Sequence, residues 1–479
     1  MLFSSESQTE SPRDPIRMVG TRSDLPRSAS PNHQSFFPCL EKDKFRWCLD
    51  CQVLNSLIKK HGVRYEAVEE VRTFLCKGDF CTSVDVKGAF LHIPIHPNSR
   101  YLLQFSANGT IYQFNTLPFG VSSAPFFWTK IFGVLIRRIR SLGIRVSVYM
   151  DDLLSASSDF ETCLKHTALV ISILEEAGIT INFEKSVLSP SQKIVHIGFL
   201  WNTRSNVILL RRSKINDISK AARHLLNLPS PTSRDLARMS GKLISTSPAL
   251  LPAIYKRRPL TRDIKITNQN WDQPVTLSHA SIKALKFFSS PHLISKFNGR
   301  PLVQANPFWI LTSDASPSGW GATLEAPHAS PPIHLTTKGS FSSSELLQSS
   351  NFKETLALTL ATLSFKDVII NSQNLSILFR SDNTTAVSYL RKMGGPIAHL
   401  EEAISPLIKW IIRHRIHYQV SHIPGRENEK ADSLSRSKRR DHDYILSRHQ
   451  FTYLESQWGP HSIDLFASRI NKQATRFAS

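Results

Sequence analysis

An apolar stretch of the chain is interrupted by two adjacent acids. Tyr149-Met150-Asp151-Asp152 follows the apolar Val146–Val148 and precedes Leu153–Leu154. The alternating apolar residues predict strands, and the acids stand where the chain should turn. A carboxylate pair that becomes buried there repels itself unless a cation neutralises it. Mg²⁺ prefers carboxylates together with substrate phosphates, so this hairpin favours nucleotidyl transfer over its alternative, an ordinary polar turn.

A third acid strengthens this interpretation. The segment Thr82–Phe90 is predicted to be a strand that ends near Asp85 and then turns. We expect Asp85 to meet Asp151 and Asp152 on a neighbouring strand. Three clustered acids suit a two-metal site for in-line phosphoryl displacement, in which one metal activates a 3′-hydroxyl and the other holds the triphosphate.

Four further acids stand at the ends of separate elements in the second half of the chain. Two of them end predicted strands, and two lie in predicted helices. They are Asp314, Asp382, Glu354 and Asp432. Each acid alone is also explained as a turn residue or a helix cap. Together they predict a second metal site.

The charge of the chain points to a polyanionic partner. The formal net charge is +21 over 479 residues, which favours nucleic acid, with an anionic membrane surface as the competing partner. The start of the chain has no signal-peptide core, and no apolar run approaches the length of a membrane span. We therefore expect an intracellular protein of the cytoplasm or nucleus, with no membrane partner and no secretion.

The six cysteines allow two interpretations. Cys48-x-x-Cys51, followed by Cys76 and Cys81, has the spacing of a zinc site. The first pair, however, lies around Phe45–Asp50, which predicts a strand instead of a zinc knuckle. We therefore expect free thiols in a reducing compartment.

Six segments, in order along the chain, resemble the motifs of reverse transcriptases. They are the fingers segment Lys44–Asn55, motif A with Asp85 and Phe90, motif B Leu117–Pro125, motif C Tyr149–Asp152, motif D Gly178–Lys185 and the primer-grip region His196–Phe199. The resemblance implies an RNA-directed DNA polymerase whose partners are an RNA template, a DNA primer and dNTPs. Two features depart from the family. Cys51-Gln52 stands where the family has Tyr-Arg, and residues 1–35 do not resemble the expected fingers helix.

The resemblance also implies roles for side chains around the first three acids. Arg46 and Lys44 would contact the incoming triphosphate, since guanidinium groups fit phosphate oxygens. Phe90 would stand against the sugar 2′ position and exclude ribonucleotides, unless it is a plain core aromatic. Four further residues are implied as substrate contacts. They are Phe119 and Gly120 near the nascent base pair, Tyr149, and Lys185, which is equally explained as a solvated surface lysine.

The four downstream acids resemble the metal ligands of ribonuclease H in the same order, and His422 matches its mobile histidine. The resemblance implies cleavage of RNA in an RNA–DNA hybrid, with two Mg²⁺ or Mn²⁺ ions in each of the two active sites. Several phrases look most like tyrosine-recombinase (DIRS-like) retrotransposons. They are Leu236–Leu243 with Pro248-Ala249, Ser381–Val387 with Gly394-Gly395, and Ile463–Ser468.

These patterns predict a multidomain α+β and α/β chain, in which a right-hand polymerase precedes a ribonuclease H-like mixed-sheet domain. The expected divisions are a disordered or atypical leader at 1–35, fingers and palm at 36–212, a helical thumb or connection at 213–305, the ribonuclease H-like domain at 306–436, and a basic tail with the start of a further region at 437–479. Within them we expect helices at 164–178 and 353–363 and a helix N-cap at Thr232 or Ser233.

Two functions are compatible with these features. The first is a polymerase and ribonuclease H segment of a longer retrotransposon polyprotein. The alternative is a truncated, catalytically inactive nucleic-acid-binding relic of a retroelement, in which the positive charge preserves binding while the atypical leader prevents polymerisation. The intact set of seven acids favours the enzyme, since drift should have removed at least one of them.

Overall fold

The computed structural model describes residues 16–21, 36–41, 44–107, 110–265, 270–304, 306–372, 374–436, 448–465, 467 and 472–478. It divides into two compact units, Met1–Arg211 with Pro301–Val303, and Arg212–Arg300 with Gln304–Ser479. The described part of the expected leader, Ile16–Thr21, is a strand. The rest of that leader and the basic residues 438–440 lie outside the described residues. Within the described ranges, no helix is both long enough and apolar enough to cross a membrane.

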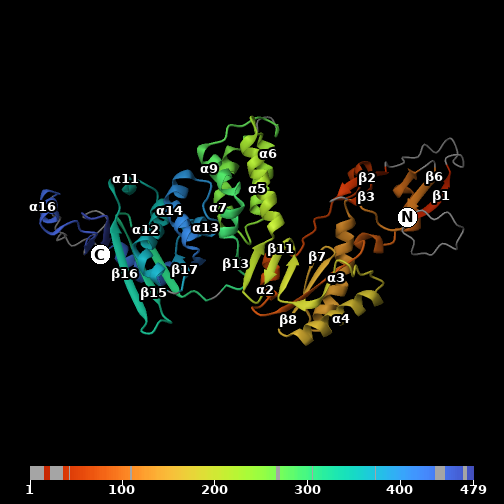
Figure 1. Cartoon of the computed structure of the whole chain (residues 1–479), viewed down its shortest axis with the longest axis horizontal. Coiled ribbons are helices and arrows are strands. Elements are labelled where there is room, and N and C mark those ends of the chain that lie inside the picture. The colour runs from red at the N-terminus through yellow and green to blue at the C-terminus, as the bar shows by residue number, and fades with distance from the viewer. Residues whose placement is uncertain are drawn as a thin grey trace. The chain divides into compact units, whose positions relative to one another are not determined.

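The first unit is built on a four-stranded antiparallel sheet in the order β7-β8-β4-β9 (Figure 1). Its strands are β4 (Phe80–Asp85), β7 (Arg145–Tyr149), β8 (Asp152–Ser157) and β9 (Val187–Ser191). Helices α3 (Ala124–Ser141) and α4 (Phe160–Glu176) pack against this sheet and share one core with it. We call this sheet the palm sheet.

Local sequence explains where helix α4 begins and ends. Asp159 caps it by accepting a hydrogen bond from the Thr162 amide (2.8 Å), so α4 begins earlier than the predicted 164–178. Gly178 adopts a positive φ of 77° just after the helix, as a C-terminal stop requires.

Smaller elements surround the palm sheet. A three-stranded sheet has the order β1-β6-β5, β2 pairs with β3, and a second four-stranded sheet runs β10-β11-β12-β13. The bounds are β1 (Ile16–Thr21), β2 (Phe36–Glu41), β3 (Lys44–Leu49), α1 (Gln52–Leu57), α2 (Val68–Phe74), η2 (Ala89–His92), η3 (Pro97–Leu103), β5 (Gln104–Ala107), β6 (Thr110–Phe114), β10 (Lys193–His196), β11 (Phe199–Asn202), β12 (Val207–Leu210) and β13 (Arg300–Pro301). Among the described cysteines, Cys76, Cys81 and Cys163 are free thiols. The side chains of Cys39 and Cys48 lie outside the described residues.

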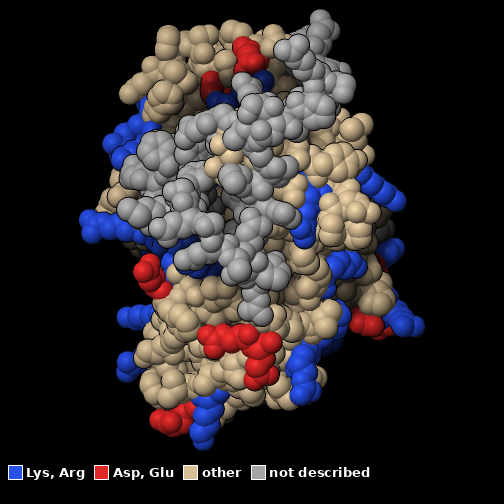
Figure 2. Space-filling view, turned by 90° about the vertical axis from the view of Figure 1, so that its right-hand side faces the viewer, with Lys and Arg blue, Asp and Glu red and all other residues tan. Residues whose placement is uncertain are grey.

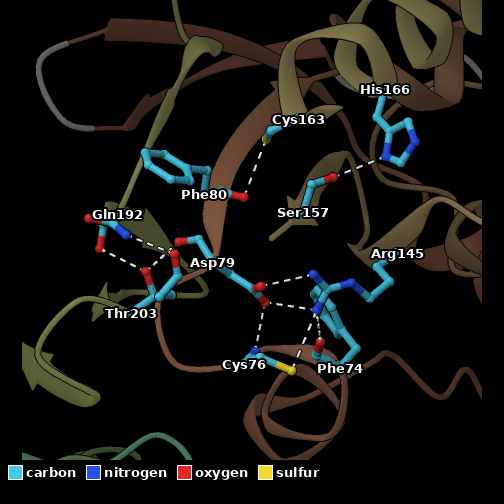
Figure 3. A network of polar contacts seen from close by, with 11 residues as sticks. Phe74, Cys76, Asp79, Phe80, Arg145, Ser157, Cys163, His166, Gln192 and Thr203 are labelled. Carbon is cyan, nitrogen blue, oxygen red and sulfur yellow. Dashed lines mark hydrogen bonds and ion pairs between the residues drawn. The ribbon is translucent and has the colours of Figure 1, made fainter. Parts of the chain in front are cut away.

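A polar network holds the amino-terminal ends of β4 and β7 (Figure 3). The buried Asp79 accepts two hydrogen bonds from the Arg145 guanidinium, at 2.8 and 2.9 Å, and a third from the Cys76 amide. Arg145 also donates to the Phe74 carbonyl, and the hydroxyl of Thr203 donates to the Asp79 carbonyl. The network therefore fixes the end of the palm sheet opposite to Asp85 and Tyr149.

We expect the Asp79→Asn variant to destabilise the first unit by about 3 kcal/mol, because it leaves the partly buried Arg145 cation without its carboxylate. The free energy of opening, measured by hydrogen exchange in peptides covering β4 and β7, checks this. Arg64→Gln, which breaks the exposed ion pair with Glu70, is the matched control and should change that free energy by less than about 1 kcal/mol. Equal effects of the two variants would show that the network does not stabilise the sheet.

The second unit begins with a helical part, whose helices α5, α6 and α9 lie side by side in Figure 1. Its helices are α5 (Arg212–Asn227), α6 (Ser233–Ile244), α7 (Leu251–Lys256), α8 (Arg258–Asp263), α9 (His279–Phe288) and α10 (Pro291–Phe297). Thr232 is the N-cap of α6: its side chain accepts a hydrogen bond from the Asp235 amide, and Asp235 accepts one from the Thr232 amide. This reciprocal pair is a capping box.

A five-stranded mixed sheet follows, in the order β16-β15-β14-β17-β18. β14 pairs antiparallel with β15 and parallel with β17. The bounds are β14 (Trp309–Ala315), β15 (Gly319–Ala326), β16 (Ile333–Ser340), β17 (Ser376–Ser381), β18 (His417–His422), α11 (Ser343–Leu346), α12 (Ser350–Asn371), α13 (Thr384–Arg391), α14 (Ala398–His414), η4 (Gly425–Glu427), α15 (Glu429–Arg436), α16 (Arg448–Trp458), β19 (Ile463–Leu465) and β20 (Arg476–Ala478). Helix α12 extends beyond the predicted 353–363 at both ends, and Ser349 caps its start by accepting a hydrogen bond from the Phe352 amide.

Arg258 of α8 connects the helical part to the α/β part within the second unit. Its guanidinium donates hydrogen bonds to the carbonyls of Lys392 (2.8 Å), Met393 (2.7 Å) and Gly394 (2.6 Å), just after α13. Gly394 has a φ of 111°, and a Cβ there would lie 2.9 Å from the Arg258 Nε. The close approach of this cation therefore requires a glycine.

Candidate functional site

The palm sheet brings three of the predicted acids to one end. Asp85 of β4 lies opposite Asp152 of β8 in the register, and Tyr149 and Asp152 close the β7–β8 hairpin around Met150-Asp151. Met150 has a positive φ of 58°, which is uncommon for a residue with a side chain. Two hydrogen bonds to its carbonyl and to that of Asp151 hold this turn, from the Trp128 indole (2.9 Å) and the Val86 amide (2.8 Å).

The surroundings of Asp85 and Asp151 disfavour the ionised forms of these two acids. Burial raises the pKa of Asp85, and the nearby Lys185 cation and Asn182 amide oppose this shift. Burial also raises the pKa of Asp151, and the neighbouring carboxylates of Asp85 and Asp152 add to the effect. Carboxylates that burial and like charges both penalise are a donor set that fits a hard divalent cation.

The residues predicted to contact substrate differ in their exposure to solvent, and two of them have side chains outside the described residues. Phe90 is buried, with its ring centroid 5.2 Å from that of the exposed Phe119. Gly120 has a φ of 115°, and a Cβ there would lie 2.6 Å from the Leu49 carbonyl oxygen, so a contact within the chain already requires this glycine. Tyr149 is partly exposed beside Tyr65. Lys44 and Arg46 belong to β3, but their side chains lie outside the described residues.

Glu66 is a residue that the sequence patterns did not reveal. One oxygen of its carboxylate accepts a hydrogen bond from the Val148 amide (3.0 Å), and the other pairs with Arg140 (2.5 Å). Val148 lies on β7, an edge strand of the palm sheet, one residue before Tyr149. Glu66 therefore satisfies a backbone amide on the edge strand, next to the acidic turn. No local motif signals this contact, because 82 residues separate the two partners.

The second unit brings three further acids together. Thr312 of β14 pairs with Arg380 of β17 in parallel, and Asp314 and Asp382 each follow two residues later. Glu354 is the fifth residue of α12 and is buried. One oxygen from each of these three carboxylates lies within 4.8 Å of the other two. Among the described residues, no other group of three metal-ligating side chains comes this close together. In particular, the acids of the palm sheet lie further apart than this.

Burial and neighbouring negative charges disfavour the ionised forms of Glu354 and Asp314 in this second cluster. Burial raises the pKa of Glu354 to about 8, and the carboxylates of Asp314 and Asp382 contribute to the increase. Burial likewise raises the pKa of Asp314. Oε2 of Glu354 is buried, and no described group forms a hydrogen bond with it. A buried acceptor of this kind, beside two more carboxylates, fits a divalent cation.

A stability measurement on the metal-free chain tests the raised pKa of Glu354. The folded-state pKa of Glu354 lies above its ordinary value of 4.5, so the contribution of this carboxyl is present below about pH 4.5 and is lost as the pH rises to about 8. With chelator present, we expect a loss of roughly 4 kcal/mol over that interval. Denaturant unfolding of the second unit at both pH values should show the loss in the parent and a much smaller one in Glu354→Gln. The same loss in the variant would contradict the assignment.

The remaining two predicted residues lie at the edge of this cluster. Asp432 pairs with Arg436 (2.7 Å), one turn further along α15, so it does not join the group of three. Nε2 of His422 lies 2.9 Å from the Asp382 carbonyl oxygen. Both residues are therefore near the acids, while the prediction of four converging carboxylates holds for three of them in this structure.

Two side chains that the sequence analysis missed orient Asp314. The buried Asn428 donates to its Oδ1 (3.0 Å), and the buried Ser435 donates to its Oδ2 (2.7 Å). A signal was available in the sequence, because residues 428, 432 and 435 share one face of a helix. Helix α15 packs closely there because Gly321, opposite Asp314 on β15, has no Cβ; one would lie 2.5 Å from the Leu434 side chain.

Comparisons with known proteins identify the first of these regions. Residues 32–200 match the family described as reverse transcriptase (RNA-dependent DNA polymerase). The retrovirus-related Pol polyprotein from transposon 297 of Drosophila melanogaster is 24% identical over 403 residues, which are 83% of this chain and 35% of that protein. The enzymatic polyprotein of cauliflower mosaic virus (strain Strasbourg) is 24% identical over 404 residues, which are 82% of this chain and 55% of that protein.

A solved structure extends the likeness to the fold. The foamy viral protease-reverse transcriptase in complex with ds DNA has a TM-score of 0.51 and 19% identity, over 82% of this chain and 65% of that chain. The chain thus carries a reverse transcriptase domain of the kind found in retroelement and retroviral polyproteins, within a mixed α/β fold. It spans 35% and 55% of the length of the two polyproteins above.

Proposed function

We propose that the chain is an RNA-directed DNA polymerase with ribonuclease H activity, which copies retrotransposon RNA into DNA and degrades the RNA of the resulting hybrid. The observation that carries the proposal is the pairing of Asp85 with Asp152 at the end of the palm sheet, inside the segment that matches the reverse transcriptase family. Primer extension on an RNA template tests it.

In the proposed polymerase site, Asp85, Asp151 and Asp152 would hold divalent cations. When bound, these cations supply activation of the primer 3′-hydroxyl and neutralise the leaving pyrophosphate. The held turn at Met150 keeps the acids in place, since its carbonyls are already paired with Trp128 and Val86. Lys185 lies close enough to Asp85 and Asp151 to affect their pKa values, which suits a contact with the triphosphate together with Arg46 and Lys44.

Phe90 provides a test of sugar selection. It is buried beside Phe119 and follows Asp85 by five residues, which suits an aromatic wall for the sugar 2′ position. We expect Phe90→Val to raise the ratio of kcat/KM for ribonucleotides to that for deoxyribonucleotides by at least about tenfold, which corresponds to the loss of about 1.4 kcal/mol of discrimination. Single-nucleotide incorporation kinetics measure this ratio. The exposed Phe127→Val variant is the control, and an unchanged ratio in Phe90→Val would leave Phe90 a core aromatic.

For the proposed ribonuclease H site, Asp314, Glu354 and Asp382 would hold the divalent cations, whose chemistry is activation of water against an RNA phosphodiester. Asp432 and His422 would serve at the edge of the site, and Asn428 and Ser435 would keep Asp314 oriented. The mixed sheet, with acids at the carboxyl ends of adjacent parallel strands, supports this assignment.

We place the polymerase at 36–212, the helical connection at 213–305 and the hydrolytic domain at 306–436.

The charge distribution supports RNA, DNA and dNTPs as partners. Between residues 212 and 300, Lys and Arg outnumber Asp and Glu by 16 to 4, so the helical part contributes much of the net charge of +21. Figure 2 shows Lys and Arg side chains distributed around the face that it presents, with fewer acidic groups between them. Such a surface attracts the phosphate backbone of nucleic acid.

The sequence segments that resemble DIRS-like elements, such as Ser381–Val387, support assignment to that subgroup. A recombinase reading frame next to this one would be the test.

A further inference from the structure

A buried histidine lies against one of the palm acids. Nδ1 of His196 is 3.1 Å from Oδ2 of Asp152, across a separation of 44 residues. The His196 side chain has no solvent exposure, whereas the Asp152 side chain is 35% exposed. Since an ionised carboxylate can only accept, Nδ1 of the imidazole carries the proton of this hydrogen bond.

The rest of the imidazole is costly to bury. Nε2 of His196 is buried, and no group in the described part of the chain forms a hydrogen bond with it. A buried polar atom without a partner costs about 1–3 kcal/mol, and an apolar side chain of similar size would avoid that cost. The contact with Asp152 is therefore the interaction that offsets this penalty.

The backbone around His196 is fixed by a strained turn. His196 and Phe199 pair across a two-residue hairpin in which Ile197 has a φ of 48° and Gly198 a φ of 78°. Positive φ is rare for a β-branched residue such as isoleucine. The carbonyl of His196 also accepts a hydrogen bond from the fully buried Trp201 indole (2.9 Å). The turn and the indole together fix the backbone that carries the imidazole.

We propose that His196 is a positioning residue, which fixes the orientation of the Asp152 carboxylate for divalent-cation binding. The hydrogen bond engages Oδ2 of a carboxylate that is 35% exposed and belongs to the residue opposite Asp85 in the register. This inference rests on the proposed polymerase function. A partner that holds a metal ligand in this way is worth about 10- to 100-fold in metal affinity or activity.

Two substitutions separate this role from simple packing. His196→Asn keeps an N–H donor near the position of Nδ1, and His196→Leu keeps the volume without a donor. We expect His196→Leu to lower kcat for primer extension about 10- to 100-fold with an unchanged KM for dNTPs, and His196→Asn to recover most of that loss. Thermal stability of His196→Leu should be equal to or higher than that of the parent, and hybrid cleavage by the second unit should be unchanged in both variants.

A readout independent of catalysis completes the test. Mn²⁺ binding is measured by electron paramagnetic resonance in a Glu354→Gln background, which weakens the second cluster. Weaker Mn²⁺ binding with His196→Leu and near-parental binding with His196→Asn support the proposal; equal binding and equal extension in all three chains overturn it. If the parent does not extend a primer, the proposed function fails, while the Mn²⁺ comparison still decides the role of His196.

Discussion

The Asp151→Asn variant is expected to lose primer extension on an RNA template by at least about a thousandfold. The amide removes a negative charge from the acidic turn and with it several kcal/mol of cation-mediated transition-state stabilisation, and about 4 kcal/mol corresponds to a thousandfold. The fold should survive, because the backbone hydrogen bond from the Val86 amide to the Asp151 carbonyl does not involve the side chain. Single-turnover extension with Mg²⁺, at saturating primer-template, measures the loss.

The neighbouring exposed acid Asp159, which caps α4 outside the site, supplies the matched control. Asp159→Asn retains a capping side chain and should extend primers as the parent does. Hybrid cleavage by Asp151→Asn should also equal that of the parent, since the second cluster lies in the other unit. Extension by Asp151→Asn within tenfold of the parent would contradict the assignment of the polymerase site.

The Asp382→Asn variant is expected to show the reverse pattern. Asp382 supplies one of the three carboxylates whose oxygens lie within 4.8 Å of one another, so its loss should reduce cleavage of RNA in a hybrid by at least about a thousandfold. Primer extension should remain at the parental level. Cleavage of an RNA–DNA hybrid that is labelled at the RNA 5′ end, with EDTA as the metal-free blank, measures the effect.

An acid on the outer surface of the same unit controls for charge alone. Asp272→Asn removes an exposed carboxylate that pairs with Arg234, and it should leave cleavage unchanged. If Asp382→Asn cleaved hybrids as well as Asp272→Asn does, the cluster of Asp314, Glu354 and Asp382 would have another role. Loss of both activities in Asp382→Asn would instead indicate a folding defect.

The palm hairpin was predictable from the sequence for local reasons. Strand-forming residues flank Tyr149–Asp152 on both sides, and two acids cannot lie in an apolar core without a turn or a cation. The pairing of Asp85 with Asp152 needed one further step, the choice of a neighbouring strand. The register of β4 and β8 places the two acids opposite each other, and residues 32–200 match the reverse transcriptase family that the ordered motifs resemble.

The contacts that support the acids were not predictable in the same way. Glu66 and His196 reach the hairpin from 82 and 44 residues away. No motif marks Glu66, and the resemblance of His196–Phe199 to a primer-grip region does not predict a contact with Asp152. Helix α12 was placed too short because four of its nine buried residues are polar, namely Glu354, Thr355, Thr359 and Thr362, which weakens the apolar periodicity that marks a one-sided helix. Asp432 was expected among the ligands, but its pairing with Arg436 depends on side-chain geometry.

The central claim is that the chain polymerises DNA on RNA, and extension by the unaltered chain tests it most directly. A labelled DNA primer annealed to an RNA template is incubated with the protein, dNTPs and Mg²⁺ or Mn²⁺. The account predicts metal-dependent DNA products that reach the template end and that Asp151→Asn does not form. Tight, salt-sensitive binding of the same primer-template with no extension in either metal would contradict the account and would identify a nucleic-acid-binding relic.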